Sequence, residues 1–78
     1  MEIVNKIGIR INKLRIEQNL SQEKLAEKAD LDRTYVSSIE RGKRNVSVIN
    51  LEKISHALGY SLQDFFSNEL FTNKKTGK

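Results

Sequence analysis

The sequence predicts an all-α fold of five helices joined by short polar turns. Three observations carry this expectation. Apolar residues recur every three or four positions, as one face of a helix requires, and no stretch alternates apolar and polar residues as a half-buried strand does. Residues that start and stop helices bracket each apolar stretch. With 78 residues and no proline, the chain has room for one domain with a small core.

The first helix is expected at about residues 3–18. One face of it carries apolar residues at spacings of four, four and three, namely Ile3, Ile7, Ile11 and Leu14. Gly8 interrupts this stretch, although glycine inside a helix costs about 1 kcal/mol relative to alanine. The apolar face is therefore expected to pack on the rest of the domain in spite of Gly8.

Two short helices with a tight turn between them follow. Ser21 is a suitable N-cap for a helix at 22–29, because its hydroxyl accepts a hydrogen bond from a free backbone N–H. Asp30 occupies the turn, where aspartate tolerates left-handed backbone angles. Asp32 is the expected N-cap of a third helix at 33–41. This arrangement is the sequence form of a helix-turn-helix.

The last two helices are marked in the same way. Ser47 is expected to cap a helix that runs to about Leu58, and Gly59 follows as its C-terminal stop. Ser61 with Asp64 three residues later resembles a capping box, and it begins the fifth helix.

Composition excludes several classes of protein. The chain has no cysteine, which rules out disulfides and cysteine-based zinc sites. No apolar run exceeds two residues, so we expect neither a membrane span nor a signal peptide. The single histidine, His56, has no grouping of catalytic partners around it in the sequence. We therefore expect a cytoplasmic protein that is not an enzyme and that needs no cofactor or metal.

Charge is distributed unevenly along the chain, whose net charge is +4. Residues 1–44 carry a net charge of +3, residues 45–73 a net charge of −2, and residues 74–78 three lysines. We expect the basic half to face nucleic-acid phosphates, although chance segregation alone also produces such a pattern. The domain is expected to occupy residues 1–71, and residues 72–78, which have nothing to bury, to form a disordered basic tail.

The third helix carries the residues typical of a DNA-reading surface. Val36 and Ile39 point to one side, and the other side holds Arg33, Thr34, Ser37, Ser38 and Arg41. Arginine matches O6 and N7 of guanine, and short hydroxyls let a helix lie close to base edges. Tyr35 lies at the border, where it can stack on the backbone or touch a thymine methyl group. A solvated outer face is the alternative, but Arg beside small hydroxyls favours recognition.

Contacts with the DNA backbone are expected on both sides of that helix. Gln22 begins the preceding helix, and at the start of a helix a polar side chain and free N–H groups can contact a phosphate. That Gln22 is an ordinary surface residue is an equally weighted alternative. A compact basic loop after the third helix is expected to contact phosphates rather than bases; it comprises Arg41, Lys43, Arg44 and Asn45. Arg15 and Glu40 lie at the edges of two buried stripes, and we expect them to pair and to fix the angle of the third helix.

The fifth helix and the residues after it offer more apolar surface than one neighbouring helix covers. Leu62 and Phe65 are expected to belong to the core. Phe66, Leu70 and Phe71 are expected to form a two-fold interface between copies of the chain. Such a dimer places the third helices of its two copies about 34 Å apart, which is one turn of DNA.

These features occur together in a specific order. They include Leu20-Ser21-Gln22, Leu25-Ala26, Ile39-Glu40-Arg41-Gly42, Leu51, Ile54, Ala57-Leu58 and Phe65-Phe66. With this order, the stretch from Ile7 to Phe66 resembles the Cro/CI-type (XRE, lambda-repressor-like) helix-turn-helix family. The residues from Asp32 to Ser37, with Arg44-Asn45 after them, are similar to the controller (C) proteins of restriction–modification systems. The sequence departs from the broad family at Asp30, where glycine is usual, and at Val46, where proline is frequent.

The resemblance implies a lambda-repressor-like fold and a homodimer bound to a near-palindromic double-stranded DNA operator. The positions that it matches to DNA contacts are Gln22, Arg33, Thr34, Tyr35, Ser37, Arg41, Arg44 and Asn45. Controller proteins activate their own gene and that of the restriction enzyme when scarce, and repress them when abundant; whether RNA polymerase is a partner stays open. An antitoxin or phage-type repressor that acts through a protein partner is the alternative, and non-specific DNA coating is a third.

Overall fold

The computed structural model describes residues 2–72, and these residues form helices and turns without any strand. The helices are α1 (Ile3–Glu17), α2 (Gln22–Ala29), α3 (Arg33–Glu40), α4 (Val48–Ala57) and α5 (Leu62–Phe66), followed by a short 3₁₀ helix, η1 (Glu69–Phe71). The expected all-α fold with five α-helices is confirmed, and α1, α3 and α4 each end one residue earlier than expected. Residues 73–78, most of the expected tail, lie outside the described part.

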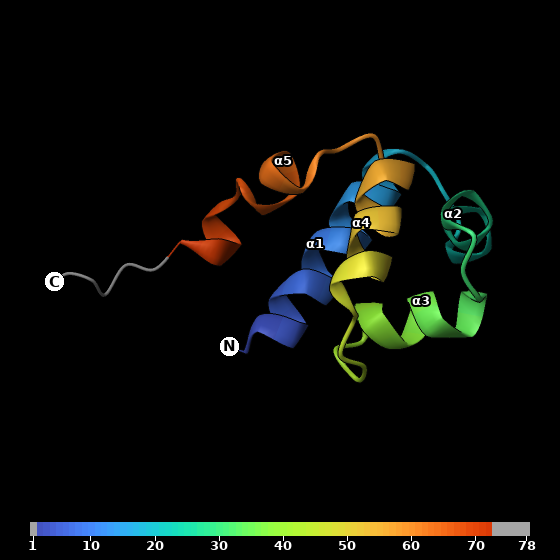
Figure 1. The fold of residues 1–78 in the computed structure, drawn as a ribbon, viewed down its shortest axis with the longest axis horizontal. Helices are drawn as coiled ribbons and strands as arrows, with labels where there is room; N and C mark the ends of the chain where they lie inside the picture. Colours follow the sequence, from blue (N-terminus) through green and yellow to red (C-terminus); the bar gives the residue numbers. More distant parts are fainter. Residues whose placement is uncertain (1, 73–78) are drawn as a thin grey trace, which may run out of the picture.

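The helices surround one apolar core. α1 packs on α3, and α2 packs on both α3 and α4. Figure 1 shows α3 across one end of the domain with α2 next to it, and α5 and η1 on the side opposite α2. The side chains with essentially no exposure come from all five α-helices, and include Ile11, Leu14, Leu25, Val36, Ile39, Ile54 and Phe65. Ile3 was expected on the buried face of α1, but it is 54% exposed. That expectation is wrong because the first turn of α1 extends beyond the core.

Three of the four expected N-caps form their hydrogen bonds. The hydroxyls of Ser21, Ser47 and Ser61 each accept from a backbone N–H three residues later, at 2.9–3.1 Å. Asp32 occupies the N-cap position of α3, but its side chain makes no capping hydrogen bond. The expected position is therefore correct and the expected contact is not. Asp30 adopts φ 58° and ψ 47°, the left-handed conformation expected of this turn.

Gly8 lies where the backbone of α1 approaches the end of α3 closely. A Cβ at this position would overlap the carbonyl oxygen of Ile39 and lie 2.9 Å from that of Glu40. Both oxygens belong to the backbone at the end of α3, which cannot move aside as a side-chain tip can. The glycine that weakens α1 as an isolated helix therefore allows α1 and α3 to pack together.

Among the described residues, no helix combines the length and the apolar character that crossing a bilayer requires.

Candidate nucleic-acid interface

The two sides of α3 differ sharply in burial. Val36 and Ile39 are 0% and 1% exposed, so the apolar side is sealed against α1 and α2. The opposite side is open at Arg33 and Thr34, and Ser37 is half-buried. The hydroxyl of Ser38 donates to the Thr34 carbonyl oxygen at 2.9 Å, within the helix. The residues expected to face base edges thus lie on one accessible surface.

Tyr35 links α3 to the loop and the helix that follow it. Its hydroxyl oxygen accepts a hydrogen bond from Nδ2 of Asn50 at 3.0 Å. The guanidinium carbon of Arg44 lies 4.9 Å from the centre of the Tyr35 ring, within the range of a cation–π contact. Tyr35 is half-buried and holds Arg44 beside α3 in the free protein, a function that the sequence did not indicate.

The loop after α3 presents its basic residues next to that surface. Gly42 adopts φ 71°, and a Cβ there would overlap Oδ1 of Asn5, so the turn requires glycine. The N–H groups of Gly42 and Lys43 donate to carbonyl oxygens of α3 at 3.0 and 2.9 Å. The side chains expected to contact phosphates are all exposed, namely Arg41, Lys43, Arg44 and Asn45.

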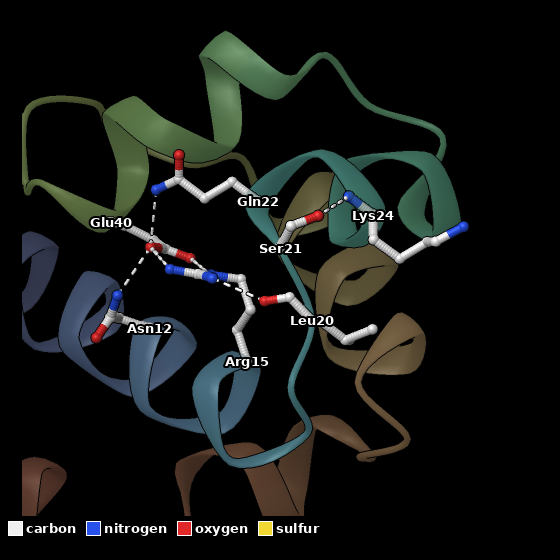
Figure 2. A network of polar contacts seen from close by, with 7 residues as sticks. All are labelled: Asn12, Arg15, Leu20, Ser21, Gln22, Lys24 and Glu40. Carbon is white, nitrogen blue, oxygen red and sulfur yellow. Dashed lines mark hydrogen bonds and ion pairs between the residues drawn. The ribbon is translucent and has the colours of Figure 1, made fainter.

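Behind α3, the carboxylate of Glu40 joins three helices (Figure 2). Its Oε2 accepts from Nε of Arg15 at 2.7 Å, which is the ion pair expected from the sequence. Its Oε1 accepts from Nη2 of Arg15, Nδ2 of Asn12 and Nε2 of Gln22, each at 3.0 Å. Arg15 also donates from Nη1 to the Leu20 carbonyl oxygen at 2.8 Å. The side chains of Arg15 and Glu40 are only 12% and 3% exposed.

This environment lowers the pKa of Glu40. Burial of the carboxyl group opposes its charge and acts to raise the pKa, but hydrogen bonds from Arg15, Asn12 and Gln22 and the charge of Arg15 outweigh burial. Glu40 is therefore ionised at neutral pH. A buried carboxylate with this many donors is costly to disturb, since loss of one partner leaves a charge uncompensated.

Arg10 is a buried charge that had no place in the sequence-based expectations. It is 9% exposed, and its Nε and Nη2 donate to the carbonyl oxygens of Phe65 and Asp64 at 2.7 and 3.1 Å. Its guanidinium carbon also lies 5.4 Å from the centre of the Tyr60 ring. Arg10 thus fastens α5 to α1. Its position between Ile7 and Leu14 on the apolar face of α1 is the signal that pointed to burial.

The residues expected at a dimer interface belong to α5 and η1, on the side of the domain opposite α2 (Figure 1). Phe66 and Phe71 are half-buried and meet edge to face at 4.8 Å. Leu70 is half-buried as well, and with α1 it lines a groove of about 640 Å³. Among residues 2–72, the most exposed large apolar side chains are instead those of Val48 and Ile49 at the start of α4, at 74% and 70%.

Known proteins share this architecture. A family model described as helix-turn-helix matches residues 11–65. Control protein C.MunI of Mycoplasma sp is 56% identical over 68 residues, which cover 86% of this chain and 92% of C.MunI.

Solved structures of controller proteins are also similar to the chain. The restriction–modification controller protein C.AhdI from Aeromonas hydrophila superposes with a TM-score of 0.77 at 44% identity, covering 81% of this chain and 96% of C.AhdI. The controller protein C.Esp1396I, solved as a tetramer with its natural 35-base-pair operator, superposes with a TM-score of 0.81 at 41% identity and covers 90% and 92% of the two chains. The chain therefore belongs to the Cro/CI-type helix-turn-helix family of DNA-binding regulators and, within it, to the restriction–modification controller proteins.

Proposed function

We propose that this chain binds a near-palindromic operator as a homodimer and regulates its own gene and that of a restriction enzyme. The observation that carries the proposal is the polar side of α3, which is open to solvent while its apolar side is fully covered. A helix mounted in this way fits the major groove of B-DNA. The DNA-binding domain occupies residues 1–71 in this proposal, and the protein acts in the cytoplasm, where such an operator is found.

The residues divide into two groups by the part of the duplex that they meet. Those on α3 read bases, and they are Arg33, Thr34, Ser37 and, at the border, Tyr35. Those at the start of α2 and in the loop after α3 contact phosphates, and they are Gln22, Arg41, Lys43, Arg44 and Asn45. Phosphate contacts supply affinity that weakens with salt, whereas base contacts supply specificity.

A selection from random duplexes tests this division. The wild-type protein is expected to enrich one near-palindromic sequence and to prefer it by at least ~10³-fold over unrelated DNA. Arg33→Ala is expected to relax base choice within each half-site. Arg44→Ala is expected to weaken binding to all duplexes alike and to reduce the salt slope by about 1. Two variants with indistinguishable selection profiles and salt slopes would contradict the division.

The dimer is proposed to form through Phe66, Leu70 and Phe71. Phe66 and Phe71 also pack against Phe65, so Leu70→Asp is a cleaner test than a change at either phenylalanine. Sedimentation is expected to show a monomer for Leu70→Asp and a dimer for Ile49→Lys, the matched change in the exposed apolar pair of α4. The reverse result would place the interface at the start of α4.

Regulation by this dimer also requires an effect on RNA polymerase. Transcription in vitro from a promoter that carries the selected operator, with purified polymerase, is expected to rise at low protein concentration and to fall at high concentration. A monotonic response would reject the two-way regulation.

A further inference from the structure

One carboxylate oxygen connects the core of the protein with its DNA-facing surface. Oε1 of Glu40 accepts from Asn12 and Arg15 on α1, and also from Gln22, the first residue of α2. Asn12 and Arg15 belong to the packing between α1 and α3. Gln22 lines a hollow together with Arg33, the first residue of α3. The buried ion pair and a proposed DNA contact therefore share an atom.

The carboxylate decides how the amide of Gln22 is oriented. A carboxylate oxygen only accepts hydrogen bonds, so the amide nitrogen must face Glu40 and the amide oxygen must turn away. Figure 2 shows this arrangement, with the amide oxygen of Gln22 directed away from the carboxylate. One N–H of Nε2 is used by Glu40, and the second N–H stays available for an outside acceptor.

The hydrogen bond to Glu40 already restricts the side-chain conformation of Gln22 in the free protein. Less conformational entropy is therefore left to lose when DNA binds. Fixing a glutamine side chain costs up to about 2 kcal/mol of conformational entropy. A side chain that is already held in one rotamer does not incur that cost when a ligand arrives.

We propose that Glu40 is a positioning residue for DNA binding, which holds Gln22 so that the second N–H of its amide donates to a backbone phosphate. The inference rests on the proposed function, because it needs a duplex to lie against α2 and α3. Glu40 does not touch DNA in this arrangement and acts through Gln22. The ion pair of Glu40 with Arg15 stabilises the packing of α1 on α3, and its hydrogen bond with Gln22 orients the amide for DNA.

The direction in which Glu40→Gln changes the affinity for DNA distinguishes the positioning of Gln22 from a simple effect of charge. Glu40→Gln removes a negative charge near the proposed DNA surface, so electrostatics alone would raise the affinity for any duplex. Loss of positioning would lower that affinity. In addition, an effect transmitted through Gln22 must vanish once Gln22 has no amide.

The experiment is a double-mutant cycle on the affinity for the selected operator. Wild type, Glu40→Gln, Gln22→Ala and the double variant are compared at a temperature where circular dichroism shows all four folded. Glu40→Gln is expected to lower affinity about fivefold in the wild-type background, as the loss of one hydrogen bond does. In the Gln22→Ala background its effect is expected to be less than about twofold. Asn12→Ala is the matched control, since it removes another donor to Oε1 but on α1; it is expected to lower stability and to leave affinity unchanged.

Equal losses in both backgrounds, or tighter binding by Glu40→Gln, would overturn the inference. A wild-type protein that prefers its operator while the cycle shows no coupling rejects the inference alone. A wild-type protein without any preference rejects the proposed function, and the inference with it. If Glu40→Gln does not fold, NMR relaxation of the Gln22 side-chain amide in the free wild-type protein decides. An order parameter near that of the rigid backbone, about 0.85, supports positioning, and a value below about 0.6 overturns it.

Discussion

Replacement of Gly8 by alanine gives opposite predictions from the sequence and from the structure. Inside a helix alanine is more favourable than glycine by about 1 kcal/mol, so the sequence of α1 alone predicts that Gly8→Ala stabilises the protein. In the folded chain the added Cβ overlaps the Ile39 carbonyl oxygen and lies 2.9 Å from that of Glu40. These atoms are backbone, and α1 and α3 must separate to make room.

The geometry sets the size of the effect. Overpacking of a core costs typically 1–3 kcal/mol, and a clash with two backbone oxygens belongs at the upper end of that range. After subtraction of the gain in helix propensity, the net loss is about 2 kcal/mol in the free energy of unfolding. For a domain of this size, such a loss lowers Tm by roughly 8–16 °C. The separation also displaces Glu40, so operator affinity is expected to fall in the same variant.

Thermal and urea unfolding followed by circular dichroism measure this loss. The exposed position Lys13 on the same helix provides the control, because Lys13→Ala and Lys13→Gly report the propensity difference without any clash. Alanine is expected to be the more stable residue at position 13 and the less stable one at position 8. A Gly8→Ala protein as stable as wild type would refute the close approach of α1 and α3.

Further predictions concern the two buried charges. Because the pKa of Glu40 is lowered in the folded chain, its contribution to stability is complete above the unfolded pKa of about 4.3 and disappears as pH falls through the lower folded value. Urea titrations from pH 7 to pH 3 are therefore expected to show a loss of stability on acidification that is smaller in Glu40→Gln; equal slopes would exclude Glu40 as its source. Arg10→Met keeps the length of the side chain but removes two hydrogen bonds to carbonyl oxygens at α5. We expect a loss of about 1–3 kcal/mol and faster hydrogen exchange in α5, whereas unchanged exchange there would show that Arg10 does not fasten the helix.

Much of the fold could be predicted because its signals are local. Ser21, Ser47 and Ser61 cap helices through hydrogen bonds that span three residues. The expected ends of α1, α3 and α4 differ from the observed ends by one residue. The polar side of α3 was equally visible, since a helix places residues on its faces by spacing alone. Spacing alone thus placed Arg33 and Thr34 on the accessible side of α3, and their contact with DNA stays a prediction.

The rest depends on contacts between distant parts of the chain. The sequence by itself determined the helices, their order and the residue types offered to DNA, because these follow from hydrogen bonds and periodicity within a few residues. Only the tertiary structure decided that Gly8 must lack a side chain, that Arg10 fastens α5, and that Glu40 holds Gln22. These contacts join residues 18 to 55 positions apart, and they exist only because packing of the apolar core brings α1, α2, α3 and α5 to fixed distances from one another.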